Sequence, residues 1–226
     1  MAAATPAKSK AVPDRQGKRR QRTRNAIIEA AAATFLRKGV AGTTVAEITE
    51  AADVGYGSFY NHFQSLQDVV SAVANRTMAR VVSITEEVLP DEDSHELVPA
   101  VSLRIIMRLM TRDPSTRWLL EQPYIFVEEW QKVITPSMAQ YRHRSGSEPF
   151  AAMGGLKSWI RMLPWLLISE LNDAIEKGAS GEHEEILANM SLHLLGLSEE
   201  RRRVLVEASR DIVDSAILDE AGVPER

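Results

Sequence analysis

The segment that most constrains the fold is residues 44–63, TVAEITEAADVGYGSFYNHF. Two short stretches with helical apolar spacing lie on either side of a break at Asp53. The apolar groups that face each other across this break are Val45, Ile48, Ala52, Val54 and Phe59. The turn between the stretches favours a residue that tolerates a left-handed backbone, as glycine, asparagine and aspartate do. The layout predicts a helix-turn-helix, in which the second helix lies in the DNA major groove.

The rest of the chain also has helical periodicity. Apolar residues recur at helical spacing before Lys38, and Gly39 suits the position just past a helix end. No stretch alternates at period two with β-branched residues, so we expect an all-α fold. Pro136 and Pro164 fall inside predicted helices and should kink or split them. The predicted helices span residues 23–38, 45–52, 56–62, 66–88, 98–112, 114–121, 123–142, 152–176, 182–196 and 199–218.

Composition excludes several classes of protein. The chain has 226 residues, 44% of them hydrophobic and 26% charged, which is typical of globular proteins rather than disordered or fibrous ones. It has no cysteine, which excludes disulfides, cysteine nucleophiles and thiolate metal sites. The first residues lack the apolar core of a signal peptide, and no apolar run is long enough to span a bilayer. We therefore expect a cytoplasmic protein without a membrane partner.

Charge is distributed unevenly along the chain. Residues 1–80 contain 12 Lys and Arg against 6 Asp and Glu, whereas residues 81–226 contain 15 against 25. A polyanion would be attracted to the first region and repelled by the second.

Residues 1–21 form a basic arm that we expect to be disordered, since it has almost no large apolar side chain. The arm and the start of the first helix contain one acid, Asp14, and eight cations. The cations are Lys8, Lys10, Arg15, Lys18, Arg19, Arg20, Arg22 and Arg24. Alone, such a segment is equally typical of a solubilising tail. Beside a helix-turn-helix it indicates contact with DNA phosphates or the minor groove, and we expect Arg19, Arg20, Arg22 and Arg24 to take part.

The segment from Arg24 to Val70 resembles the DNA-binding domain of the TetR/AcrR family of bacterial transcriptional repressors. The matching residues are Ile27, Ala31 and Phe35, the motifs KGV and TTVAEI, then Val54, Gly57, Phe59, Tyr60, His62, Phe63, Ser65 and Val69. Three positions depart from the family pattern. Thr49 stands where alanine is usual, Asp53 where glycine is usual, and Leu66 where a phosphate-binding lysine is common. Losing that lysine removes one phosphate contact, so the slope of log K against log salt should decrease by about one unit.

The resemblance implies a domain division and a set of DNA contacts. The arm would cover residues 1–21, the helix-turn-helix domain residues 22–68, and a helical effector-binding and dimerisation domain residues 69–226. By matching position, the DNA contacts would be Thr44, Tyr56, Gly57, Ser58, Tyr60, Asn61 and His62. An amide such as that of Asn61 can pair bidentately with adenine. Phe59 and Phe63 are expected to pack instead, and the alternative for Tyr60 and His62 is the same packing role.

The C-terminal part has no catalytic signature, and we predict neither an enzyme nor a metal or cofactor site. Its aromatic and methionine side chains are numerous. Most should be ordinary core, but as a set they could line an apolar effector pocket between helices. The candidates are Met107, Met110, Trp118, Phe126, Trp130 and Trp159. Arg104 and Arg108 share one face of a predicted helix, where a snorkelling surface pair is favoured over a ligand carboxylate partner.

Helix 152–176 is apolar nearly all round and must be covered on every side. In the family that the chain resembles, the last long helices form a two-fold dimer interface. We therefore predict a homodimer contact within residues 152–196, and the alternative is a core helix within one subunit. The candidate contact residues are Leu163, Leu167, Ile186, Met190 and Leu194.

The sequence as a whole predicts a transcriptional regulator that represses by binding near-palindromic double-stranded DNA as a dimer. A small apolar effector would release it by favouring one of two states. One alternative is an all-α ligand carrier or enzyme whose basic arm is incidental. Another is an architectural DNA binder, which the acidic C-terminal part disfavours.

Overall fold

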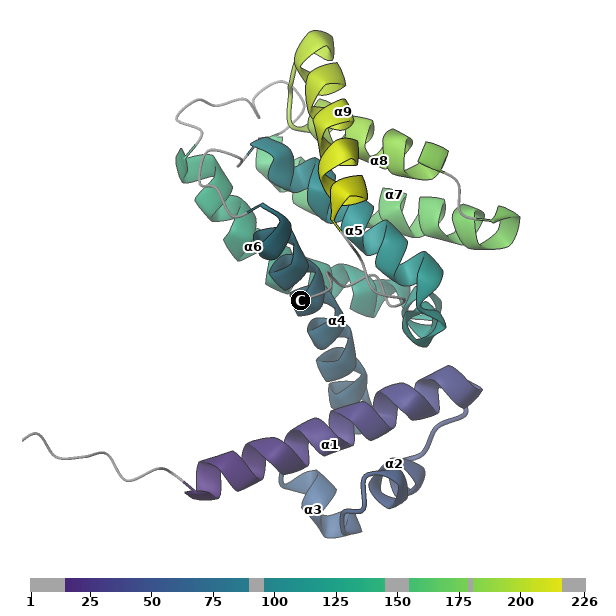
Figure 1. The fold of residues 1–226 in the computed structure, drawn as a ribbon. Helices are drawn as coiled ribbons and strands as arrows, with labels where there is room; N and C mark the ends of the chain where they lie inside the picture. Colours follow the sequence, from purple (N-terminus) through teal and green to yellow (C-terminus); the bar gives the residue numbers. More distant parts are fainter. Residues whose placement is uncertain (1–14, 90–95, 145–154, 179–180, 217–226) are drawn as a thin grey trace, which may run out of the picture.

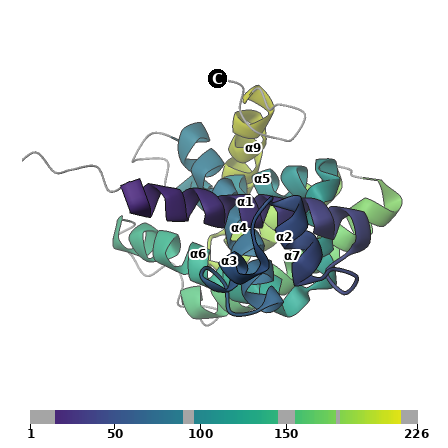
Figure 2. The ribbon, with the colours of Figure 1, turned by 90° about the horizontal axis from the view of Figure 1, so that it is seen from below.

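The chain is described by a computed structural model that covers residues 15–89, 96–144, 155–178 and 181–216. Within these ranges the regular structure is helical and contains no strand, so the predicted all-α fold is confirmed. Helices α1 (Arg15–Lys38), α2 (Val45–Ala51) and α3 (Tyr56–Tyr60) form a small head at one end of the molecule (Figure 1). Figure 2 views this head from below, with α1 lying across α2 and α3.

Helix α1 begins earlier than predicted. Residues 15–21 are helical, so the expectation of disorder for the whole arm is wrong there, while residues 1–14 lie outside the described residues. Lys, Arg and Gln lose little side-chain freedom in a helix, so this basic stretch extends the helix that the apolar residues after it anchor. Helix α1 ends as expected at Gly39, which has φ 71° and donates its N–H to the carbonyl of Phe35 at 2.9 Å.

Helix α4 (Leu66–Val88) leaves the head and enters a larger helical body (Figure 1). The predicted domain boundary after residue 68 falls inside this continuous helix. The body contains α5 (Val98–Arg112), η2 (Pro114–Glu121), α6 (Pro123–Arg144), α7 (Gly155–Lys177), α8 (Gly181–Leu194) and α9 (Glu199–Ser215). Segment η2 is a 3₁₀ helix. Neither Pro136 nor Pro164 splits its helix, since α6 and α7 continue past both.

One hydrophobic core runs from the head into the body. Its junction is aromatic: the rings of Phe35 on α1 and Trp118 on η2 have centroids 5.0 Å apart. Trp118 was predicted to line an effector pocket, but it packs against the head instead, because η2 lies against α1. A smaller core of Ala100, Ala188, Leu192 and Leu205 joins α5, α8 and α9.

The search for membrane spans covered the described residues. It found no helix among them that combines the length and the apolar character needed to cross a bilayer.

Candidate nucleic-acid interface

Helix α2 is fixed at its start by a capping box. The hydroxyl of Thr44 accepts the N–H of Glu47 at 3.4 Å, and the carboxylate of Glu47 accepts the N–H of Thr44 at 2.9 Å. The ammonium of Lys38 also pairs with that carboxylate. These contacts, the Lys38 hydrogen bond first and those of Thr44 next, lower the pKa of Glu47 to about 2. The Thr44 hydroxyl donates to Glu47 at 2.8 Å, so its predicted phosphate contact would compete with the cap.

The turn between α2 and α3 has the left-handed residue that the sequence predicts. Asp53 has φ 52° and is the one non-glycine residue of the described chain with positive φ. The N–H of Val54 then returns to the carbonyl of Thr49 at 3.0 Å. Thr49, a departure from the family pattern, is buried and donates its hydroxyl to the carbonyl of Ala46 at 2.8 Å. That departure is therefore accommodated inside the head.

Helix α3 separates packing residues from exposed ones. Phe59 and Phe63 are buried, as expected. Tyr56 and Tyr60 are 56% and 49% exposed, and their hydroxyls lie 3.2 Å apart with the rings edge to face. The hydrogen bond from Tyr56 is the main cause that raises the pKa of Tyr60, so the Tyr60 phenol is neutral at neutral pH. Two neighbouring hydroxyls on an exposed helix can donate to phosphate oxygens.

The other predicted DNA contacts lie within α3 or in the two residues that follow it. Gly57 and Asn61 are exposed, whereas Ser58 and His62 are half-buried. A Cβ built on Gly57 would meet nothing within 4 Å, and its φ is not positive, so nothing in the described chain requires glycine at this position. A glycine on an exposed helix allows the backbone of an outside partner to approach closely.

The N-terminal half of α1 lies against the end of α3. The guanidinium of Arg20 donates to the carbonyl of Asn61 at 3.4 Å, and that of Arg24 lies 4.9 Å from the ring centroid of Phe63. Burial, and then the charges of Arg20 and Arg24, lower the pKa of His62. His62 is therefore neutral at neutral pH and can offer a phosphate only a neutral N–H.

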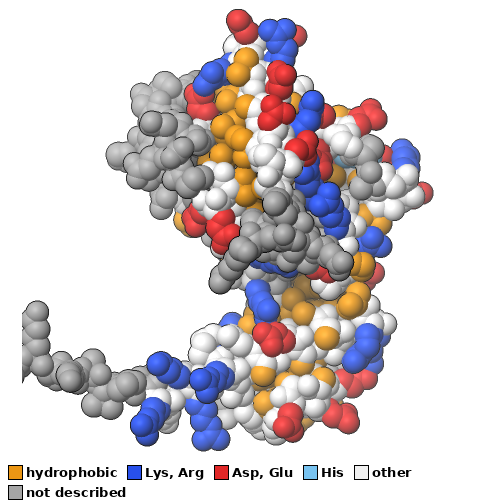
Figure 3. Space-filling model, viewed as in Figure 1, with side chains coloured by type: hydrophobic (Ala, Val, Ile, Leu, Met, Phe, Trp, Pro, Cys, Tyr) orange, Lys and Arg blue, Asp and Glu red, His pale blue; other side chains and the backbone are white. Residues whose placement is uncertain are grey.

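The remaining cations of this half of α1 are exposed. They are Arg15, Lys18, Arg19 and Arg22. Figure 3 shows blue side chains gathered at this end of α1, away from the acidic groups of the body. Because residues 15–21 are helical, these charges project from a rigid helix rather than from a flexible arm. The basic charge of residues 15–21 agrees with the prediction, whereas their helical conformation does not.

The start of α4 follows the recognition segment directly. Ser65 caps this helix by accepting the N–H of Asp68 at 3.2 Å, and Asp68 accepts the N–H of Gln64 at 2.8 Å. Leu66, which replaces the usual lysine, is half-buried and packs against the core. Leu66 thus makes an apolar contact at the position where the family pattern commonly has a phosphate-binding lysine.

The predicted effector-pocket residues are all buried. Met107, Met110, Trp118, Phe126, Trp130 and Trp159 belong to the core. The four cavities described for the structure are lined by other residues. One polar atom stands out: the indole N–H of Trp130 has no hydrogen-bond partner, the only such buried side-chain atom within the described ranges. An unpaired buried donor costs about 1–3 kcal/mol, so it requires an explanation.

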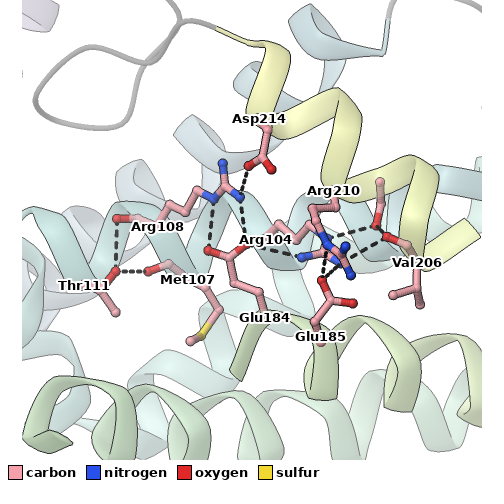
Figure 4. Close-up of polar contacts among 10 residues, drawn as sticks. Arg104, Met107, Arg108, Thr111, Glu184, Glu185, Val206, Arg210 and Asp214 are labelled. Carbon is pink, nitrogen blue, oxygen red and sulfur yellow. Dashed lines mark hydrogen bonds and ion pairs between the residues drawn. The ribbon is translucent and has the colours of Figure 1, made fainter. Parts of the chain in front are cut away.

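Arg104 and Arg108 of α5 form an ion-pair network instead of a snorkelling pair (Figure 4). Arg104 is 1% exposed and donates to Ser209 at 2.9 Å, Glu185 at 2.8 Å, Glu184 at 3.3 Å and the Val206 carbonyl at 3.1 Å. Arg108 pairs with Glu184 at 2.9 Å and with Asp214 at 2.6 Å. The expected surface pair is therefore wrong for Arg104, because two acids on α8 and a hydroxyl and a carbonyl on α9 accept its hydrogen bonds. The network holds α5, α8 and α9 together beside a cavity of about 570 Å³.

Three of the predicted dimer contacts are wrong for this fold. Leu163, Leu167 and Leu194 are buried within the single chain, because α7 and α8 turn these faces toward their own neighbours. Ile186 and Met190, the other two, are exposed. Sequence analysis missed two further exposed apolar residues, Met162 and Trp165 on α7. Together, Met162, Trp165, Ile186 and Met190 form what we call the α7–α8 apolar face.

The described residues contain no group of three or more histidine, cysteine, aspartate or glutamate side chains that could hold a metal ion.

Comparisons with known proteins agree with this arrangement. Residues 27–73 match the model of the family described as "Bacterial regulatory proteins, tetR family". The chain is 35% identical over 98 residues to the HTH-type transcriptional regulator TtgR of Pseudomonas putida, which covers 41% of this chain and 47% of TtgR. It is 48% identical over 42 residues to the repressor DhaR of a Mycobacterium species, covering 19% and 21%. The chain therefore matches about half the length of TtgR, and less of DhaR.

Solved structures extend the likeness to the body. A structure of RolR with its ligand resorcinol has a TM-score of 0.68 at 24% identity and covers 84% of this chain and 95% of that one. A gamma-butyrolactone receptor has a TM-score of 0.54 at 20% identity and covers 86% and 98%. At these identities the likeness concerns the fold.

Proposed function

We propose that this chain, whose residues 27–73 match the tetR family model, is a TetR-type, sequence-specific DNA-binding regulator that represses transcription by occupying an operator. The observation that carries the proposal is the exposed polar face of α3, where Tyr56, Tyr60 and Asn61 lie outside while Phe59 is buried beneath them. A recognition helix needs this division, since its inner face must hold it on the head while its outer face meets the DNA grooves.

Contacts to DNA divide into two kinds. Asn61, Ser58 and the N-terminal residues of α3 would read base edges, because amides and hydroxyls match the donors and acceptors of the major groove. Tyr60, with Arg19 and Arg22, would hold phosphates and supply affinity that does not depend on sequence. Arg20 and Arg24 already contact the end of α3, so they would also fix the angle between α1 and the recognition helix.

A homodimer would present two such heads to a near-palindromic operator. Half-sites on one face of DNA are about 34–36 Å apart, which requires two heads held at a fixed spacing. The α7–α8 apolar face lies in the body and exposes four large side chains that a second copy would bury. We propose this face as the dimer contact, in place of the buried leucines suggested by the sequence.

An effector would act by changing how the body holds the head. Relatives in fold include RolR with resorcinol and a gamma-butyrolactone receptor, so we propose a small, largely apolar molecule for this chain. Helix α6 contacts α4, and the carboxylate of Glu129 accepts the amide N–H of Asn75 on α4 at 3.0 Å. Glu129 is itself buried. A ligand that shifts α6 would therefore shift α4 and the head attached to it.

The test is selection of DNA by the purified protein from a random library, followed by fluorescence anisotropy on the selected site. We expect a near-palindrome bound in the nanomolar range typical of specific sites, and at least about a thousandfold weaker binding to scrambled DNA. Replacing Arg15, Lys18, Arg19 and Arg22 by alanine should reduce the slope of log K against log salt.

Two outcomes would contradict the proposal. Binding that does not depend on sequence would indicate an architectural DNA binder. No DNA binding, together with tight binding of a small molecule, would indicate a helical carrier or enzyme.

A further inference from the structure

The buried tryptophan on α6 has a donor that the protein does not use. Trp130 is 1% exposed, and its indole N–H has no acceptor within reach among the described residues. Its neighbour Trp159, 6.0 Å away between ring centroids, is equally buried but donates its N–H to the hydroxyl of Ser191 at 2.9 Å. The same core thus satisfies one indole and leaves the other free, although buried indole N–H groups usually find a partner.

Trp130 belongs to an aromatic seam between α6 and α7. On the inner side its ring is nearly parallel to Phe126, with an angle of 11° and centroids 6.5 Å apart. Tyr124 lies six residues before Trp130 on α6, and Trp165 lies six residues after Trp159 on α7. The rings of Tyr124 and Trp165 meet edge to face, with centroids 5.7 Å apart. Tyr124 and Trp165 are exposed. The seam therefore runs from the surface to the unpaired donor, with ring faces and edges that suit a planar aromatic molecule.

The charge of the surroundings defines the class of molecule further. In the described body the buried ionisable side chains are Arg104, Glu129 and His183, and all three have protein partners. Arg104 is held by Glu184 and Glu185, Glu129 by Asn75 and Lys132, and His183 by Glu170. No free buried charge is left in these ranges to offset an ion, so a charged ligand would lose its hydration without compensation.

We propose that Trp130 is the hydrogen-bond donor of the effector site, and that the effector is a neutral, planar aromatic molecule with an acceptor oxygen. The inference rests on the proposed control by an effector, and it specifies the chemical class of that effector. In this proposal the ligand enters along the seam between α6 and α7, whose outer end is the exposed ring of Tyr124 and whose inner end is Trp130 beside Trp159. Glu129, the next residue of α6, holds Asn75 on α4, so that separation is transmitted toward the head.

Three matched probes test the inference: acetophenone, α-methylstyrene and benzoate. The first two have the same planar skeleton, but only acetophenone has an acceptor oxygen, and benzoate adds a charge. We expect acetophenone to bind about tenfold more tightly than each of the others, which corresponds to about 1.4 kcal/mol. Nitrogen-15 labelling of the four indoles gives a second readout. The Trp130 indole proton should move downfield with acetophenone and not with α-methylstyrene.

Trp130→Phe keeps an aromatic ring and removes the donor, so it should abolish the preference for acetophenone. Trp159→Phe is the matched control, because its N–H already serves Ser191, and there the preference should persist. Equal affinity of wild-type protein for acetophenone and α-methylstyrene would overturn the proposal, and this measurement needs no variant. Failure of acetophenone to bind would also overturn it. Operator binding measured on the same sample separates the two proposals, since it tests the DNA-binding function independently of the effector site.

Discussion

In the head, most cations of α1 and the phenols of α3 lie on the surface, whereas in the body Arg104 and Arg108 of α5 lie between helices and are paired. Arg19 and Tyr60 are exposed, while Arg104 has hydrogen bonds to α8 and α9 from every guanidinium nitrogen. The exposed groups of the head, such as Arg19 and Tyr60, therefore contribute little to its folding and are accessible to a partner. Those of the body determine how its helices assemble. Substitutions should reveal this difference as a separation between binding and stability.

The largest expected effect is on the stability of the body. Arg104→Ala removes the centre of a buried network and leaves Glu184 and Glu185 without it, so the free energy of unfolding should fall by about 3–5 kcal/mol. Arg112→Ala is the control, because Arg112 is on the same helix but exposed, and it should change stability by less than about 0.5 kcal/mol. Urea unfolding followed by circular dichroism measures both. Equal effects would show that the network does not hold the body together.

The next effect concerns assembly. Met190→Glu places a charge in the α7–α8 apolar face and should convert a dimer to monomers, with operator affinity reduced by about a hundredfold or more because one head loses the other's effective concentration. Val204→Glu is the matched control, since Val204 is a similarly exposed apolar residue on α9. Sedimentation velocity and fluorescence anisotropy give the two readouts. Two results would show that this face is not the dimer contact. One is a wild-type monomer that binds a palindrome tightly, and the other is loss of the dimer in both variants.

The head was predictable because its signals are local. The helix end at Gly39 and the turn at Asp53 each depend on residues a few positions away. The separation of Phe59 from Tyr60 follows from helical spacing alone. The error in the head, the helical state of residues 15–21, arose because charge pattern was used to infer disorder, although the same residues are good helix formers.

The body was predictable in its helix ranges but not in its contacts. Helix α7 is apolar all round, so its sequence does not say which face meets its own chain and which meets a second copy. Leu163 and Leu167 turned out to face inward, and Trp165 outward. Arg104 is similar: its acidic partners lie 80 and 81 residues further along the chain, so no local pattern links them. Glu129 follows Glu128 directly in the sequence, and nothing local separates the buried carboxylate of Glu129 from the exposed one of Glu128.

The third prediction separates binding from stability in the head. Asn61→Ala should lower operator affinity by about 1–3 kcal/mol and relax the preference at one base position, if its amide reads adenine. Its free energy of unfolding should change by less than about 0.5 kcal/mol, because the side chain is exposed. Asn172→Ala, the same change on α7, should leave affinity unaltered. An unchanged affinity in Asn61→Ala would exclude this side chain from the DNA contact.

The smallest effect is expected at the turn of the head. A left-handed backbone costs an ordinary residue about 1–2 kcal/mol, and aspartate less, so the φ of 52° at Asp53 stores modest strain. Asp53→Gly relieves it but gives the unfolded chain more freedom, so we expect a net stabilisation below about 1 kcal/mol in urea unfolding. Asp53→Ala should lower the free energy of unfolding, because alanine tolerates a left-handed backbone less well than aspartate does.

Asp53→Asn completes this set, since it keeps the tolerance for positive φ and removes the charge. Asp53 is exposed next to α3, so both the glycine and the asparagine variants should bind the operator slightly more tightly, with the gain fading as salt increases. Only the glycine variant should also be more stable. If the asparagine variant gained as much stability, charge repulsion within the head, rather than backbone strain, would be the cost of aspartate at this turn.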